Sequence, residues 1–232
     1  MQVAGFADFR RTLIGSSVAT RTQEVAASLA PYDVIAWQEK LTGRRFDEAI
    51  EVILLHFSKP HGISTQSQMF LQALDYPIDT TVRIAAHEML HPPIDLKGAA
   101  ALAALAVFRR DALLDRIVRE HNPSFGYTTL EGLFDEDLVE ALDQLISEQL
   151  GVAKPAAERW RVADDGMHVL AAGLYGLLKQ DGWAETGGNI ERWVAAAARR
   201  GRLAPAVLHP NAARVLGRPA GQLWSPLSPS KA

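Results

Sequence analysis

Apolar residues recur at helical spacing along most of this chain. Pro31 divides the first two helical segments, and Pro92 and Pro93 end a later one, because proline cannot continue a helix. Asp111 stands immediately before another segment and is a favoured N-cap residue. The spacing predicts helices over residues 22–29, 33–41, 80–91, 96–108, 111–121, 129–150, 164–179, 189–200 and 211–216.

The segment 51–57 has a different pattern. Val52 to Leu55 form a short, unbroken apolar run that is typical of a strand, and a turn signal follows it. A second strand is predicted over residues 68–73, so that the pair forms a hairpin or a small sheet. We therefore expect a mainly helical α+β protein with one domain over residues 1–218. Residues 219–232 are rich in proline and serine and are expected to form an irregular tail.

The composition is that of a globular protein. Apolar residues make up 48% of the 232 residues and charged residues 22%, which is too apolar for a disordered chain. The net charge of −3 argues against a nucleic-acid partner bound through a broad basic face. The chain has no cysteine, which excludes disulfides, thiolate metal sites and a cysteine nucleophile. Any transition metal must therefore be held by His, Asp or Glu.

No apolar stretch reaches the roughly 18 residues that a membrane span needs. The longest one, over residues 98–108, is predicted to be a buried helix. No secretory signal is visible at the start of this chain. Two locations stay open: the bacterial cytoplasm, or export with the signal trimmed.

The residues His87-Glu88-Met89-Leu90-His91 form an HExxH motif. On a helix, residues i and i+4 differ by about 40° around the axis and about 6 Å along it, so both imidazoles can ligate one metal ion. Glu88 lies about 100° from His87 around the helix, where it can contact a water molecule on that ion. The motif therefore predicts a zinc site with His87 and His91 as ligands and Glu88 as general base.

A catalytic zinc ion usually has three protein ligands, and two glutamates compete for the third position. Glu131 falls on the predicted apolar face of its helix, where a buried carboxylate needs a partner. Asp135, one turn further on, can accept a hydrogen bond from a ligand imidazole. Glu136 is the alternative ligand if Gly132 breaks the helix. Glu131 also fits a capping box that begins at Thr128, which is a purely structural role.

At these residues the chain resembles the gluzincin branch of HExxH zinc metallopeptidases, in which a glutamate ligand follows on a later helix. The segment 131–135, Glu-Gly-Leu-Phe-Asp, looks like the glutamate setting of that family. The resemblance covers residues 50–150 and implies a zincin-like fold with a bound zinc ion. Its ligands would be His87, His91 and Glu131. Glu88 would be the base, and Asp135 would lie behind the ligands.

Two features modify this resemblance. The segment 136–141 is similar to the ligand helix of some uncharacterised bacterial gluzincin-like families, which favours Glu136 as the third ligand. The additional histidine of a metzincin is absent, because Pro92 and Pro93 follow the motif directly. In zincins an extended peptide binds along an edge strand, and the strand over residues 51–57 can serve that purpose or be an ordinary buried strand.

A peptidase of this type needs a donor for the oxyanion that develops during attack on the carbonyl. The candidates are Tyr127, His168, Tyr175 and His61. The leading hypothesis is a zinc-dependent metallopeptidase with a peptide or protein substrate. Two alternatives stay open: a non-catalytic helical binding or regulatory module with a structural or vestigial metal site, and a metal hydrolase that acts on a non-peptide amide.

Overall fold

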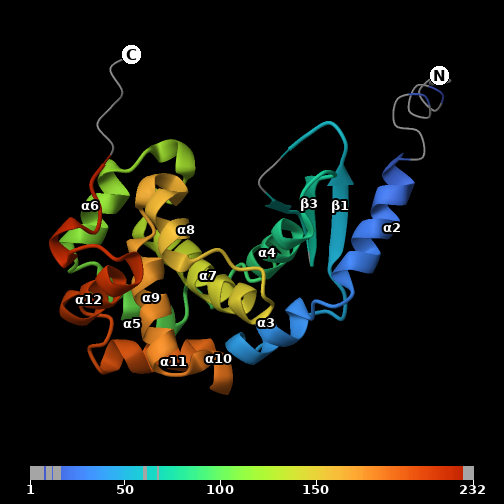
Figure 1. Ribbon diagram of the computed structural model, residues 1–232. Helices are drawn as coiled ribbons and strands as arrows, with labels where there is room; N and C mark the ends of the chain where they lie inside the picture. The colour runs from blue at the N-terminus through green and yellow to red at the C-terminus, as the bar shows by residue number, and fades with distance from the viewer. Residues whose placement is uncertain (1–7, 9–11, 13–16, 60–61, 67, 227–232) are drawn as a thin grey trace, which may run out of the picture.

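The computed structural model describes residues 8, 12, 17–59, 62–66 and 68–226 (Figure 1). A small sheet and helix α2 (Ser17–Leu29) lie on one side of the molecule, and the helices of the second half of the chain lie on the other. Helices α4 (Ile78–Glu88) and α7 (Leu130–Gln149) lie between these two parts. The buried apolar residues form one continuous cluster that includes both helices. The predicted mainly helical α+β class is confirmed.

The sheet has three strands in the order β1-β3-β2: β1 (Glu51–Leu55), β2 (Ile63–Ser64) and β3 (Met69–Ala73). Strand β1 pairs with β3 in parallel, in a register that sets Val52 opposite Phe70. Strand β2 pairs with β3 in the antiparallel direction. The small sheet is therefore confirmed, but the hairpin alternative is wrong. The connection between β1 and β3 is long enough to return to the start of the sheet, and it contributes β2 on the way.

Helix α4 follows the sheet and presents Val82, Ala85 and Ala86 to the core. It ends at Glu88, earlier than the predicted end at residue 91. His91 precedes Pro92, and a residue before proline is disfavoured in the helical conformation because the proline ring crowds its backbone. The second histidine of the motif therefore lies in the turn after the helix rather than on it.

Most of the other helices agree with the sequence pattern to within a few residues. They are α3 (Val34–Thr42), α5 (Ala99–Phe108), α6 (Ala112–Glu120) and α11 (Ile190–Arg199). Helix α12 (Pro205–Leu216) begins well before the predicted start at residue 211, because Pro205 is favoured in the first turn of a helix. Helix α9 (Val169–Gln180) begins later than predicted, because Asp164 and Asp165 have positive φ angles of 44° and 58° that interrupt a helix. The pattern did not predict α8 (Ala156–Val162) or α10 (Trp183–Thr186), which are short.

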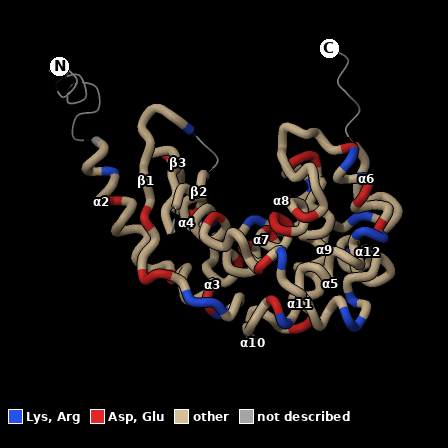
Figure 2. The backbone as a smooth tube through the Cα atoms, turned by 180° about the vertical axis from the view of Figure 1, so that it is seen from behind, with Lys and Arg blue, Asp and Glu red and all other residues tan. Residues whose placement is uncertain are grey.

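Helix α7 is the central element of the fold. It packs against α4, α5, α6 and α9, and its residues are buried without a break from residue 136 to residue 147. This buried length includes the acidic residues Glu136, Asp137, Glu140 and Asp143. Figure 2 shows acidic positions along α7 in the middle of the molecule. Buried carboxylates need hydrogen-bonding or charged partners, so the residues that face α7 must include such partners.

The start of the predicted tail contains a short 3₁₀ helix, η3 (Ala220–Gln222), and is packed against the rest of the protein. Leu223 and Trp224 are buried, and Arg116 Nη2 on α6 donates to the Trp224 carbonyl at 2.7 Å. The rest of that tail, residues 227–232, lies outside the described residues. Within the described part of the chain, no helix combines the length and the apolar character that crossing a membrane requires.

Candidate metal centre

The two histidines of the HExxH motif converge where α4 ends. Their rings lie 5.1 Å apart between centroids, and His87 Nε2 lies 3.3 Å from His91 Nε2. His87 belongs to the last turn of α4, and His91 follows in a turn that begins with a hydrogen bond from Leu90 N to the His87 carbonyl at 3.0 Å. The structure therefore brings the two predicted ligands together, although the helix itself carries only the first.

Glu136 on α7 completes a group of three possible metal ligands with these imidazoles. Its Oε1 lies 3.4 Å from His87 Nε2, and its Oε2 lies 3.4 Å from His91 Nε2. Donor atoms at about 2.0–2.2 Å from a tetrahedral ion are about 3.3–3.6 Å apart from one another. The donor spacing in this group therefore fits one tetrahedral metal ion.

Glu131 lies elsewhere. Its side chain is 44% exposed and accepts a hydrogen bond from Arg109 Nη2 at 2.7 Å, which lowers the pKa of its carboxyl. Thr129 caps α7 by accepting from Gly132 N, so the capping box that begins at Thr128 does not form. Of the two glutamates considered for the third position, the structure groups Glu136 and not Glu131 with the imidazoles. Because α7 is buried on all sides from residue 136 to residue 147, its apolar stripe does not specify which residue of that stretch faces α4.

A carboxylate stands behind each imidazole. His87 Nδ1 donates to Asp143 Oδ2 at 2.7 Å, and His91 Nδ1 donates to Asp135 Oδ2 at 3.3 Å. A carboxylate only accepts, so both protons stay on Nδ1 and both Nε2 atoms are free to ligate. Asp135 was predicted for this contact and Asp143 was missed. The signal for Asp143 was its spacing from Glu136 and Glu140, which places all three on one side of α7.

Arg159 on α8 balances the acidic residues behind His87. Its guanidinium pairs with both oxygens of Asp143 and lies 2.7 Å from Glu140 Oε1. Trp160 Nε1 donates to the other oxygen of Glu140 at 2.5 Å. His87, Glu140 and Asp143 are also close enough together to hold a metal ion. The cation of Arg159 already occupies these carboxylates, so we assign this second group the role of supporting His87.

The charges of the centre are coupled. Burial lowers the pKa of His87, but the hydrogen bond to Asp143 and the neighbouring carboxylates outweigh it, and the pKa rises to about 9. Burial also opposes the charge on His91, where hydrogen bonds with Asp135 and Glu136 raise the pKa to about 10. Burial raises the pKa of Glu136, but the two imidazoles outweigh it and hold that pKa at about 2. Without a metal ion, the centre is a carboxylate between two protonated imidazoles.

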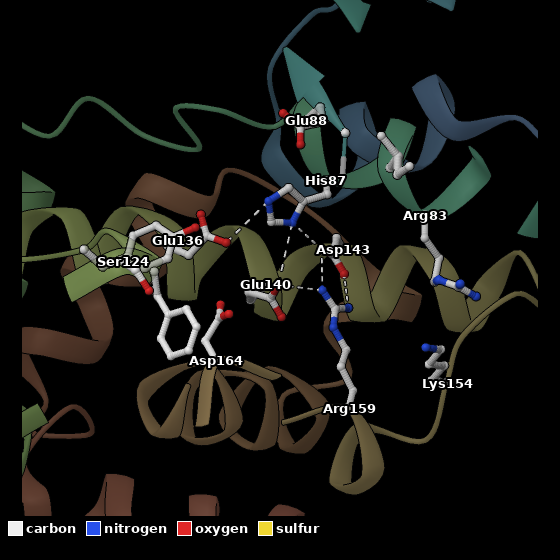
Figure 3. Close-up of a pocket in the computed structure, with 14 residues that line it drawn as sticks. Arg83, His87, Glu88, Ser124, Glu136, Glu140, Asp143, Lys154, Arg159 and Asp164 are labelled. Atoms are coloured by element: carbon white, nitrogen blue, oxygen red, sulfur yellow. Dashed lines mark hydrogen bonds and ion pairs between the residues drawn. The ribbon is translucent and has the colours of Figure 1, made fainter. Parts of the chain in front are cut away.

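Glu88 lines a pocket of about 500 Å³ together with His87 and Glu136 (Figure 3). Its Oε2 accepts a hydrogen bond from the backbone N–H of Ser64 at 3.0 Å. Ser64 belongs to β2. The next residue, Thr65, donates its backbone N–H to the Met69 carbonyl on β3, on the side of the strand opposite to Glu88. The sheet edge at the pocket is therefore β2. Strand β1, which was considered for peptide binding, is at the opposite edge and contributes no residue to the pocket lining.

The candidates for the oxyanion donor differ in their surroundings. Tyr127 lines the pocket and has a φ of 56°, which is unusual for a tyrosine. His168 is buried between Asp137 Oδ1 at 2.6 Å and Asp164 Oδ2 at 3.0 Å, so both ring nitrogens are used. Tyr175 donates to Glu148 and does not line the pocket. His61 lies outside the described residues.

Comparison of the chain with protein-family models, with curated proteins and with solved structures finds no match.

Proposed function

We propose that this protein is a zinc-dependent metallopeptidase in which His87, His91 and Glu136 hold the metal. The observation that carries the proposal is the convergence of two imidazole nitrogens, 3.3 Å apart, with the Glu136 carboxylate, whose oxygens each lie 3.4 Å from one of these nitrogens. A further carboxylate stands behind each imidazole. Two nitrogens and one carboxylate suit zinc, and three protein ligands leave a fourth position for water or substrate. The resemblance to gluzincins supports the same kind of ligand set.

A zinc ion held by His87, His91 and Glu136 would lower the pKa of a water molecule and would polarise the scissile carbonyl. Glu88 accepts the proton of the attacking water and afterwards delivers it to the leaving amine. The hydrogen bond from Ser64 N–H orients one oxygen of the Glu88 carboxylate and leaves the other for this proton. Glu88 lines the same pocket as His87 and Glu136, which supports this assignment.

We assign the oxyanion donor to Tyr127, because it is the described candidate that lines the pocket and whose hydroxyl faces the centre. Interaction of the phenol with Glu136 places it next to the proposed ligands. Burial and the neighbouring Glu136 carboxylate raise the pKa of Tyr127 above its ordinary value, so the hydroxyl stays protonated at neutral pH and can donate. His168 has both nitrogens engaged and holds Asp137 and Asp164 in place instead.

The test compares zinc content and peptide hydrolysis in five proteins purified without chelator. The wild type and Glu131→Gln should bind about one zinc ion, as expected for a single site with three ligands. His87→Ala and Glu136→Gln should lose it. Glu88→Gln should keep the zinc ion and lose turnover, because it removes the base and leaves the ligands intact.

Two results would contradict the proposal. If Glu136→Gln kept wild-type zinc affinity while Glu131→Gln lost it, the ligand set would be wrong. If the zinc-loaded wild type hydrolysed no member of a diverse peptide library, the peptidase assignment would fail. The non-catalytic module with a structural metal would then be the better description.

A further inference from the structure

The pocket beside the metal centre has a positively charged side. Arg83 lies one turn before His87 on α4, so the guanidinium and the first imidazole share a face of the helix. The guanidinium donates to two neutral acceptors, the Val152 carbonyl at 2.9 Å and Thr80 Oγ1 at 3.1 Å. No ion pair of Arg83 is found among the described residues. A guanidinium has five N–H groups, so several of them stay available for an anion.

Lys154 lines the same pocket from the connection between α7 and α8. Gln144 Nε2 donates to its carbonyl at 2.9 Å, and Arg83 binds the carbonyl of Val152 two residues earlier. The backbone that carries Lys154 is therefore held against both α7 and α4. In the described part of the chain, its ammonium group has no hydrogen bond or ion pair. Figure 3 shows Arg83 and Lys154 on the same side of the pocket, away from Glu136.

The acidic side chains of the pocket already have partners. Arg159 pairs with Glu140 and Asp143, and His168 pairs with Asp164. Glu136 lies between the imidazoles, and Glu88 accepts from the backbone of Ser64. Arg83 interacts with Asp79 and Asp143 only through longer-range attraction, and no ion pair of Arg83 or Lys154 is found in the described part of the chain. Both cations line a pocket of about 500 Å³. Such a pair attracts an anion, and the planar guanidinium suits a carboxylate in particular.

We propose that Arg83 and Lys154 bind a carboxylate of the substrate, so that peptides with a negative charge near the scissile bond are preferred. This inference rests on the proposed hydrolysis at the metal centre and names the substrate class for it. One helical turn, about 6 Å along the axis, separates Arg83 from His87. The charge therefore lies within a few residues of the bond that is cleaved. A free C-terminus and an acidic side chain both supply the required carboxylate.

Four alanine-based peptides of equal length separate these two sources. The first has an acetylated N-terminus and a free C-terminal carboxylate, and the second has a C-terminal amide. The third and fourth are amides with one central glutamate or glutamine. The zinc-loaded wild type should have a kcat/KM at least about tenfold higher for the free acid than for its amide, or for the glutamate than for the glutamine peptide. The pair that shows the difference identifies the source of the carboxylate.

The preference should depend on the two cations. Lys154→Met should lower kcat/KM for the preferred peptide about tenfold through KM and leave the neutral peptides unchanged. Lys154→Glu should reverse the preference, so that an additional amide peptide with lysine in place of the central glutamate is cleaved faster than the glutamate peptide. A merely structural role of Lys154 would not produce this reversal. Arg83→Lys keeps the charge and should retain part of the preference. Lys97→Met and Arg110→Met, which lie outside the pocket lining, are the matched controls.

Binding to Glu88→Gln, measured by calorimetry with the same four peptides, separates this inference from the proposed function. If the wild type cleaves none of them but Glu88→Gln binds the charged peptides more tightly and Lys154→Met abolishes that difference, the carboxylate site stands and the peptidase does not. Equal binding and equal cleavage of all four peptides would overturn the carboxylate site. The same conclusion follows if a preference exists but Lys154→Met and Lys154→Glu leave it unchanged.

Discussion

Each imidazole of the candidate centre is oriented by a carboxylate that accepts a hydrogen bond from its Nδ1. Asp143 holds His87 through Nδ1, and Arg159 in turn donates to both oxygens of Asp143. Such partners fix the ring rotation and the tautomer, and they raise the basicity of the ligating nitrogen. The hydrogen bond that Asp143 accepts from His87, at 2.7 Å, is shorter than the one that Asp135 accepts from His91, at 3.3 Å. We therefore expect Asp143 to contribute more to metal affinity.

Asp143→Asn should weaken zinc binding by about 10- to 100-fold, and Asp135→Asn should have a smaller effect. Competition with a chromophoric chelator measures both affinities. Asp115→Asn is a suitable control, because Asp115 is an exposed residue of α6 that pairs with Arg119. Wild-type affinity in Asp143→Asn would show that the carboxylate behind His87 does not support a metal ligand.

Zinc binding should release protons at neutral pH. The pKa of His87, about 9, and that of His91, about 10, mean that both imidazoles carry an extra proton at pH 7 in the metal-free protein. Because a ligating imidazole must be neutral, binding should release about two protons per zinc ion, and the apparent affinity should rise with pH up to about pH 10. Calorimetry in buffers of different ionisation enthalpy counts these protons. A flat pH profile would contradict the coupling of His87 and His91 to Glu136.

The ends of the helices decide which residues each element presents. Thr129 begins α7, Asp33 begins α3 and Asp111 begins α6, and each accepts a hydrogen bond from the first turn of its helix. Pro92 restricts the conformation of His91 and so places it beyond the end of α4. The positions of the candidate ligands therefore depend on where α4 stops and where α7 starts.

Two N-cap substitutions should differ in their effect on stability. Asp33→Ala removes a cap at the protein surface, where Asp33 Oδ1 accepts from Ala36 N at 2.9 Å, and should lower the free energy of unfolding by about 1 kcal/mol. Asp111→Ala should cost more, about 2–3 kcal/mol, because Asp111 is buried and also accepts from His209 Nε2 at 2.7 Å. Urea denaturation measures both values. Equal losses would mean that the contact with His209 contributes nothing.

At the scale of the whole molecule, α12 lies close against α9, and α9 packs against α7. Two glycines of α9 allow this approach. A Cβ at Gly173 would lie 2.6 Å from Leu208 Cδ1 and 3.2 Å from the Leu208 carbonyl oxygen. A Cβ at Gly176 would meet Asn211 Cβ at 3.2 Å. The small residues of α9 therefore set the distance between the C-terminal helices and the element that carries Glu136.

Gly173→Ala should lower the free energy of unfolding by about 1–3 kcal/mol, because the added methyl group overlaps Leu208 and its backbone. Gly176→Ala should have a smaller effect, since its contacts are less severe. Gly221→Ala, with no atom within 4 Å of the new Cβ, should be nearly neutral. Thermal unfolding compares the three. If Gly173→Ala were as stable as Gly221→Ala, the close approach of α12 would not constrain this position.

Local features of this protein could be predicted from sequence, because both partners lie within one turn or one strand. The HExxH spacing brings His87 and His91 together, and N-caps such as Asp111 are set by the residues that follow them. The apolar run at β1 and the helical periodicity of α6 or α11 likewise predict the elements and the α+β class. In each of these cases the chain itself holds the interacting groups close together.

Tertiary packing decided the rest. Helix α7 is buried around its circumference from residue 136 to residue 147, so the hydrophobic pattern does not tell which of its residues face α4. The grouping of Glu136, and not Glu131, with the imidazoles follows from the contacts of α7 with its neighbours. The pairing of β1 with β3, the contacts of Arg159 with Asp143 and the shared pocket of Arg83 and Lys154 also join segments that are distant along the chain. Such contacts depend on how whole elements orient when their apolar faces are buried together, and no local spacing rule specifies that orientation.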